Sequence, residues 1–298
     1  MKKFLELVNI GMVTASIFPF IIGLLFSAYY YDHINWWLML IFAICMFSLN
    51  FIVNILDNCE DYLEYQKLDD EQGLAMNVLN KYHMSIKAAH RVIRYLLLIV
   101  AITGLLLVYL TGWPILVMGL ISVFIGICYS QGSHPLSRYP VGEAASGLIM
   151  GFVIILAIVY LNTYQTIFNW TVVWQTFIVA LPSNMWISNV LLANNICDDQ
   201  ADKQMGRRTL VYFLGVKKAL HSFTGSNIIA FTAIIVAICL HLIPNWTLLT
   251  LLLIPFVHKQ TKVLYSKQDK ATTFPISVNI MIVCSVVLII SFGLGLIF

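Results

Sequence analysis

The chain has 298 residues, of which 60% are hydrophobic and only 10% are charged. This composition excludes a soluble globular domain and predicts a polytopic membrane protein. The net charge of +3 is small, and we expect no nucleic-acid partner. Six cysteines are scattered without the spacing of a disulfide framework or a zinc site.

Nine runs of mostly apolar residues are each long enough to cross the hydrocarbon core as a helix. They leave no room for a separate soluble domain, so we expect an all-α protein with residues 1–298 forming one bundle. In chain order, the predicted spans are Val8–Tyr29, Trp36–Leu56, Ile93–Leu110, Trp113–Tyr129, Gly142–Leu161, Val172–Leu192, Phe223–Ile243, Leu248–Tyr265 and Pro275–Ile297.

The charges alternate sharply from one connection to the next. All 17 Lys and Arg residues fall at one side of the predicted bundle, and the opposite loops, such as Tyr30–Asn35 and Asn162–Thr171, carry none. Basic loops face the cytoplasm in membrane proteins. The pattern therefore predicts a multi-pass protein of the cell membrane with its N-terminus and its long polar loops in the cytoplasm.

A polar stripe runs along predicted span six to its cytoplasmic end. It comprises Asn184, Ser188, Asn195, Asp198 or Asp199, and Asp202. If the helix continues past the span, Asp198 and Asp202 lie at i, i+4 on one face, where they can share a divalent cation. Mg²⁺ is favoured, because it prefers a few carboxylates with waters and substrate phosphate oxygens to a closed protein cage.

A similar stripe in span two comprises Asn50, Asn54, Asp57 or Asn58, and Asp61. Polar groups inside membrane helices are functional-site candidates, although asparagines there also serve as hydrogen-bonding links between helices. Two acidic stripes that end on the same side predict two walls of one cytoplasm-facing cavity.

The connection between spans two and three is long enough to have structure of its own. Ser85 is a candidate N-cap for a helix that carries Lys87, Arg91 and Arg94 into span three.

The second acidic stretch also carries a resemblance to a known family. It resembles the second aspartate motif of the UbiA superfamily of intramembrane prenyltransferases. The residues that carry the resemblance are Asn194-Asn195, Asp198, Asp202, Gly206 and Arg208-Thr209-Leu210. The likeness is strongest to the branch that prenylates 1,4-dihydroxy-2-naphthoate in menaquinone biosynthesis. Nine spans with both motifs in cytoplasmic loops also fit that family.

The first motif departs from the family pattern. An Asn-Asp pair followed by Asp three residues later is usual, whereas Asp57-Asn58 and Asp61 keep this outline with the central pair reversed. Several acids compete for the next position of the motif, namely Glu64, Asp69 and Asp70.

The resemblance implies that Asp57 and Asp61, facing Asp198 and Asp202, hold Mg²⁺ on the diphosphate of a polyprenyl donor. The other candidates for the diphosphate side are the amides Asn54, Asn194 and Asn195 and the basic residues Lys203, Arg207, Arg208, Arg91 and Arg94. Topology alone demands basic residues in these loops, so each of the basic candidates has that alternative explanation.

Glu143 begins span five and is a candidate for placing or deprotonating the aromatic acceptor. Its alternative explanation is a favourable charge at a helix N-terminus. For the whole chain, the expected reaction is Mg²⁺-dependent prenylation of 1,4-dihydroxy-2-naphthoate with loss of its carboxylate. The alternatives are another acceptor, such as 4-hydroxybenzoate or haem, a phosphatidyl-group transferase, and an ion-coupled transporter. The sequence leaves the oligomeric state open.

Overall fold

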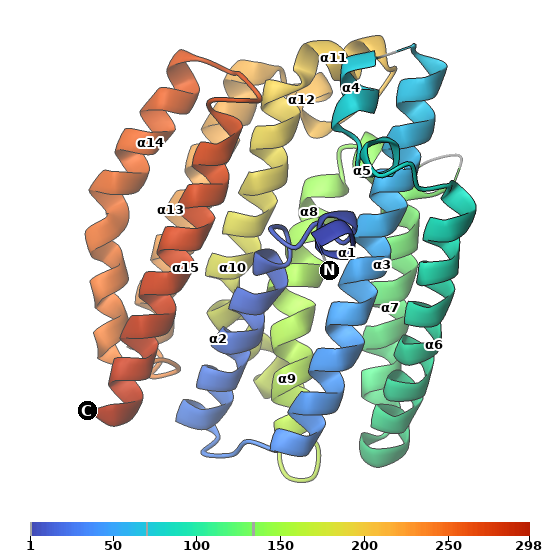
Figure 1. The fold of residues 1–298 in the computed structure, drawn as a ribbon. Coiled ribbons are helices and arrows are strands. Elements are labelled where there is room, and N and C mark those ends of the chain that lie inside the picture. The colour runs from blue at the N-terminus through green and yellow to red at the C-terminus, as the bar shows by residue number, and fades with distance from the viewer. Residues whose placement is uncertain (1, 70, 133–134) are drawn as a thin grey trace. The chain divides into compact units, whose positions relative to one another are not determined.

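The computed structural model describes residues 2–69, 71–132 and 135–298, and all the regular elements of these residues are helical (Figure 1). The chain divides into two compact units. Unit 1 comprises residues 1–16 and 36–135, and unit 2 comprises residues 17–35 and 136–298. Each unit carries one of the two aspartate motifs.

The helices that begin in unit 1 are α1 (Lys2–Leu7), α2 (Thr14–Tyr30), α3 (Trp36–Lys67), α4 (Glu71–Met76), α5 (Val78–Lys81), α6 (Ile86–Thr111) and α7 (Trp113–Ser130). Most of α2 belongs to unit 2. The core of unit 1 joins α3 to α6, where Ile52 and Ile55 pack with Ala89 and Ile93. The predicted N-cap is confirmed, because the Ser85 side chain accepts a hydrogen bond from the Ala88 N–H and starts α6.

The predicted helix Val8–Tyr29 is wrong in its first turns. Residues 8–13 form consecutive turns between α1 and α2, and Asn9 adopts a left-handed backbone conformation with φ of 48°. Side chains of α3 complete the hydrogen bonding that the missing helix would have supplied. Asn58 Nδ2 donates to the Leu7 carbonyl at 3.1 Å, and Asn54 Nδ2 donates to the Val8 carbonyl at 2.8 Å. Because these two carbonyls keep hydrogen-bond donors, the break in the helix costs little free energy.

The remaining helices of unit 2 are η1 (Leu136–Arg138), α8 (Gly142–Ser146), η2 (Gly147–Val153), α9 (Ile154–Thr163), α10 (Trp170–Cys197), α11 (Asp199–Gln204), α12 (Leu210–Leu214), α13 (Val216–Cys239), η3 (Asn245–Leu253), α14 (Ile254–Ser266) and α15 (Phe274–Ile297). At the centre of unit 2 is α10, which contacts α8, η2, α13 and α15. Because α10 carries the second motif at its end, these contacts fix the position of that motif within the unit.

Predicted span five is one continuous helical stretch, but its middle, η2, is a π-helix. Two glycines there let the backbone of η2 approach α10 very closely. A methyl group on Gly151 would lie 2.5 Å from the Asn184 Cα, and one on Gly147 would lie 2.7 Å from the Asn184 carbonyl oxygen. No side chain fits at either position without a shift of the helices.

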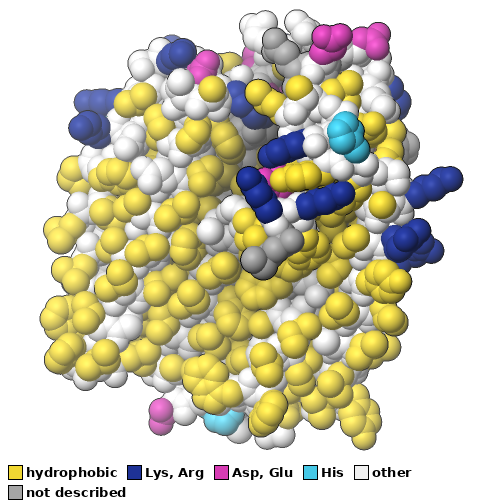
Figure 2. Space-filling model, viewed as in Figure 1, with side chains coloured by type: hydrophobic (Ala, Val, Ile, Leu, Met, Phe, Trp, Pro, Cys, Tyr) yellow, Lys and Arg dark blue, Asp and Glu magenta, His cyan; other side chains and the backbone are white. Residues whose placement is uncertain are grey.

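Seven of the helical segments in the described ranges are long and apolar enough to cross a membrane. They correspond to predicted spans two to seven and nine. Of the other two, α2 is a shorter apolar helix, and predicted span eight is divided into the 3₁₀-helix η3 and the α-helix α14. In Figure 2 hydrophobic side chains cover most of the surface in view. The protein is therefore an all-helical, polytopic membrane protein.

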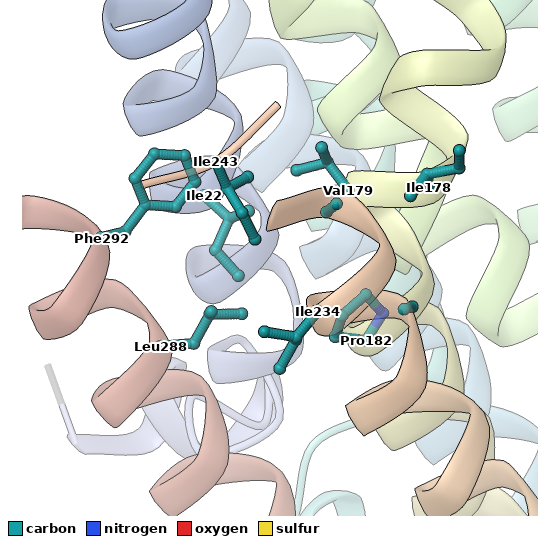
Figure 3. A pocket seen from close by; sticks show the side chains of 10 residues that line it. Ile22, Ile178, Val179, Pro182, Ile234, Ile243, Leu288 and Phe292 are labelled. Atoms are coloured by element: carbon teal, nitrogen blue, oxygen red, sulfur yellow. The ribbon is translucent and has the colours of Figure 1, made fainter. Parts of the chain in front are cut away.

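A small cavity of about 10 Å³ lies among α2, α10, α13 and α15 in unit 2 (Figure 3). It is lined by apolar side chains, including Ile22, Pro182, Ile234 and Phe292. An apolar space just large enough for one water offers no partners to a charged group. This cavity is a packing gap and does not belong to the polar site described next.

Candidate active site

The second aspartate motif begins where α10 ends. Asp198 is both the C-cap of α10 and the N-cap of α11, so the helix does not run straight through the motif. The spacing survives the break, because the Asp202 N–H donates to the Asp198 carbonyl at 2.8 Å, as in a helix. The i, i+4 relation predicted for the two aspartates therefore holds locally.

Asp202 is buried, with 4% of its surface exposed. Arg207 lies beside it, with Nη1 3.6 Å from Oδ1, and the turn that brings Arg207 back uses Gly206 with φ of 68°. Burial raises the pKa of Asp202 to about 6, although the Arg207 charge acts in the opposite direction. The Oδ2 atom is buried and has no hydrogen-bond partner among the described residues. A buried carboxylate oxygen in this state can still accept a cation.

Asp198 is more accessible and has two donors. Asn194 Nδ2 donates to Asp198 Oδ2 at 3.2 Å, and the Lys270 ammonium, from the loop between α14 and α15, contacts the same oxygen. Lys203 instead pairs with the neighbouring Asp199, Nζ to Oδ2 at 2.7 Å. The structure thus adds Lys270 to the site, and it places Lys203 on an acid outside the motif.

The two adjacent asparagines of the motif have different partners. Asn195 turns toward α8, where its Nδ2 donates to Glu143 Oε1 at 2.8 Å, and Ser188 Oγ donates to the Glu143 carbonyl at 2.9 Å. Glu143 is 5% exposed, and its second oxygen, Oε2, is buried with no hydrogen-bond partner in the part of the chain that the structure describes. The twin asparagines therefore connect α10 to two carboxylates, Asp198 through Asn194 and Glu143 through Asn195.

Arg208 is exposed, and its backbone N–H donates to the Arg138 carbonyl at 2.8 Å. This bond ties the end of the motif to η1, within the same unit. Thr209, which is buried, follows Arg208 and precedes α12.

The first aspartate motif lies at the end of α3 in unit 1. Ser130, the last residue of α7, donates its hydroxyl to Asp57 Oδ1, and Gln131 Nε2 donates to Glu60 Oε1 at 2.8 Å. Asp61 is half-buried one helical turn beyond Asp57. The contacts of Ser130 and Gln131 were not predicted, because the partners lie more than 70 residues away in the sequence.

Three residues expected on the diphosphate side have other surroundings in unit 1. The amide of Asn54 is bonded to the Val8 carbonyl and to Asn50. Arg91 and Arg94 are exposed, on faces of α6 other than the one that Ala89 packs against α3. The structure does not bring these three side chains to the carboxylate of Asp57. Of the acids that compete for the next motif position, Asp70 lies outside the described residues.

The residues present fit a cation that is held jointly with a ligand. In the described part of the chain, no three His, Cys, Asp or Glu side chains gather closely enough to hold a metal by themselves. The second motif nevertheless offers Asp198, and also the buried, unpartnered Oδ2 of Asp202. Mg²⁺ commonly takes one or two carboxylates and completes its shell with waters and phosphate oxygens.

Comparison with known proteins identifies the family. The UbiA prenyltransferase family matches residues 16–283. The chain belongs to the UbiA prenyltransferase family. It is therefore a prenyltransferase. This UbiA-family chain is 25% identical over 248 residues to the 1,4-dihydroxy-2-naphthoate octaprenyltransferase of Bacillus subtilis, covering 82% of this chain and 76% of that protein.

Solved structures agree with this family fold. A structure described for digeranylgeranylglyceryl phosphate synthase matches with a TM-score of 0.69 at 20% identity, over 99% of this chain and 98% of the other. A UbiA homologue from Archaeoglobus fulgidus, bound to GPP and Mg²⁺, matches with a TM-score of 0.68 at 14% identity, over 99% and 100% of the two chains. These likenesses show that this UbiA-family chain shares their fold.

Proposed function

We propose that this enzyme transfers a polyprenyl group from a polyprenyl diphosphate to 1,4-dihydroxy-2-naphthoate in an Mg²⁺-dependent reaction that releases diphosphate and CO₂ and gives the quinol form of demethylmenaquinone. The observation that carries the proposal is the second motif, in which Asp198 and Asp202 keep helical spacing while Asp202 retains an unpartnered oxygen. The naphthoate acceptor is supported by the Bacillus subtilis relative, whose name gives that substrate.

In this proposal Asp198 and Asp202, together with Asp57 and Asp61 of the first motif, would hold Mg²⁺ on the donor diphosphate. The metal would neutralise the charge that develops on the diphosphate as the allylic C–O bond breaks. Arg207 keeps Asp202 in place through its ion pair. Arg208 and the other basic residues of the cytoplasmic loops remain candidates for direct diphosphate contacts.

Glu143 is proposed to act on the acceptor. It is buried on α8, it is oriented by Asn195, and its free Oε2 can accept a hydrogen bond from an acceptor hydroxyl. A carboxylate on that hydroxyl raises the electron density of the ring as the ring carbon bonds to the allylic carbon and CO₂ leaves. The buried setting also excludes water, which would otherwise capture the allylic cation.

The arrangement in the membrane is proposed from the sequence. Nine helices, including α2 and the η3 and α14 pair, would cross the cell membrane as one domain. The basic loops would place the N-terminus and both motifs at the cytoplasmic side, where a cavity would open toward water-soluble substrates. The polyprenyl tail would lie against lipid.

The test is a transfer assay with the purified full-length protein. The enzyme is incubated with Mg²⁺, a polyprenyl diphosphate and 1,4-dihydroxy-2-naphthoate, and the product is identified by mass spectrometry. Asp198→Asn is expected to lower turnover by about 100-fold, because it removes a carboxylate from the leaving-group site. Asp199→Asn is the matched control, since the neighbouring acid pairs with Lys203, and it should stay within about threefold of wild type.

The outcomes separate the family assignment from the acceptor assignment. A prenylated, decarboxylated product that depends on Asp198 supports the whole proposal. Cleavage of the donor that depends on Asp198, without a naphthoate product, would refute the acceptor and favour another aromatic substrate. Equal losses in Asp198→Asn and Asp199→Asn would refute the role of Asp198.

The role of Glu143 needs a separate assay. Glu143→Gln keeps the size of the side chain and removes its charge. We expect a loss of transfer of roughly 100-fold, the range of general-base contributions, while slow donor hydrolysis without acceptor is retained. Unchanged transfer by Glu143→Gln would contradict the role.

A further inference from the structure

Lys270 is a basic residue whose side chain contacts the second aspartate motif. It lies in the loop that joins α14 to α15, and its ammonium contacts Oδ2 of Asp198. Asn194 donates to the same oxygen. Lys270 therefore sits on an atom that a divalent cation would take.

The loop holds its shape without the help of Lys270. Asp269 Oδ1 accepts hydrogen bonds from the Thr272 N–H at 2.8 Å and from the Thr272 hydroxyl at 2.6 Å. Thr273 Oγ1 donates to the Asp269 carbonyl at 2.8 Å and lies 3.7 Å from Sγ of Cys197, the last residue of α10. The loop is thus fastened directly beside Asp198, and Lys270 stays near the motif even when its ammonium leaves the carboxylate.

A metal ion and the ammonium compete for one atom. Asp198 Oδ2 already accepts from both Asn194 and Lys270, which takes up its two lone pairs. Mg²⁺ bound to this oxygen at about 2.0–2.1 Å would displace one donor, and repulsion between like charges selects the ammonium. The lysine stem is flexible, and its charge acts as a movable point charge. Once displaced, the ammonium needs another anion, and the donor diphosphate would provide one at the same carboxylate.

We propose that Lys270 neutralises Asp198 when the site holds no metal, and binds the donor diphosphate when metal and donor enter together. This inference rests on the proposed function only in taking the ligand to be a metal-bound diphosphate. It assigns Lys270 a binding role for which Lys203 is less suited, because Lys203 pairs with Asp199.

Two opposite effects distinguish this role from that of an ordinary surface ion pair. Without Lys270, the carboxylate of Asp198 loses a competitor, so a metal ion should bind more tightly when no donor is present. With metal present, the diphosphate loses a charged partner and should bind more weakly. A residue that only stabilised the loop would lower both affinities when it is removed.

The experiment compares Lys270→Met with Lys267→Met in the purified full-length protein. Lys267 is the matched control, because it belongs to the same loop, is more exposed and pairs with Asp269 at 3.6 Å. Mn²⁺ binding without donor is measured by electron paramagnetic resonance. Binding of geranyl thiolodiphosphate, which resists cleavage, is measured by calorimetry in the presence of Mg²⁺.

For Lys270→Met we expect Mn²⁺ to bind about threefold more tightly, in the range of an exposed ion pair. Geranyl thiolodiphosphate should bind about tenfold more weakly, as for the loss of one charged hydrogen bond. Lys267→Met should leave both affinities unchanged, and Lys270→Arg should keep most of the diphosphate affinity.

Equal behaviour of Lys270→Met and Lys267→Met, or a loss of both affinities in Lys270→Met, overturns the inference. The proposed function fails separately. If the two affinities shift as expected but wild type forms no naphthoate product, the acceptor assignment is wrong and the role of Lys270 stands. If product forms but Lys270→Met binds geranyl thiolodiphosphate like wild type, the role of Lys270 is wrong and the proposed function stands.

Discussion

Replacing Gly151 with alanine tests how the closest helix contact in unit 2 supports the site. The added Cβ would lie 2.5 Å from the Asn184 Cα and 2.6 Å from the Asn184 nitrogen. Ordinary contacts between such atoms are about 3.5–4.0 Å, so η2 and α10 must separate by about 1 Å. Both clashing atoms belong to the backbone and cannot rotate away. Overpacking of this kind costs about 1–3 kcal/mol.

The bond between Asn195 and Glu143 joins α10 to α8, the helix that runs directly into η2. Moving η2 away from α10 should pull α8 with it, lengthen that bond, now 2.8 Å, and release the Glu143 carboxylate from its fixed orientation. Gly151→Ala is therefore expected to raise the KM for the acceptor by several-fold, with little change for the donor. A misplacement of this size is costly for groups that must be held in position.

The assay is thermal unfolding of the detergent-solubilised protein, followed by intrinsic fluorescence, together with steady-state kinetics. For a chain of this size, 1–3 kcal/mol corresponds to a Tm lowered by roughly 2–5 °C. Gly225→Ala is the control, because it lies in α13 with nothing within 4 Å of the added Cβ. We expect it to leave Tm equal or slightly higher, since alanine favours a helix. A Tm for Gly151→Ala as high as that for Gly225→Ala would refute the reasoning.

Two further predictions concern unit 1. Ser130→Ala removes the hydroxyl that donates to Asp57, and we expect Mn²⁺ affinity to fall about tenfold, as for other groups that orient a metal ligand; unchanged affinity would refute an orienting role for Ser130. Asn58→Leu leaves the Leu7 carbonyl without its donor, which costs about 1 kcal/mol. Hydrogen exchange measured by mass spectrometry should then be about fivefold faster in residues 2–16 and unchanged in α6. Equal exchange rates in the variant and in wild type would contradict the assigned contact.

The features that depend on local sequence were predictable. Apolar runs of about 20 residues gave the helices, and Ser85 gave the start of α6, because a side-chain cap acts within three residues. The relation between Asp198 and Asp202 was predictable for the same reason, since one turn of helix sets it. Figure 1 shows most predicted spans as single long helices.

The features that depend on distant partners were not predictable. Asn54 and Asn58 were placed in a polar stripe, but their partners are carbonyls exposed only because the helix breaks at residues 8–13. Sequence periodicity did not indicate that break, because the residues there are mostly apolar. Lys270 is one of several similar lysines near the end of the chain, and only the folded loop distinguishes it from Lys267.

The hydrogen bonds from α3 to the Leu7 and Val8 carbonyls set the order in which these two segments can assemble during synthesis. Leu7 and Val8 leave the ribosome 51 and 46 residues before Asn58 and Asn54, the side chains that bind their carbonyls. The segment therefore cannot reach its final place until α3 has been synthesised and inserted. Leu7 and Val8 must wait for their partners, and the helix that carries the first aspartate motif is what receives them.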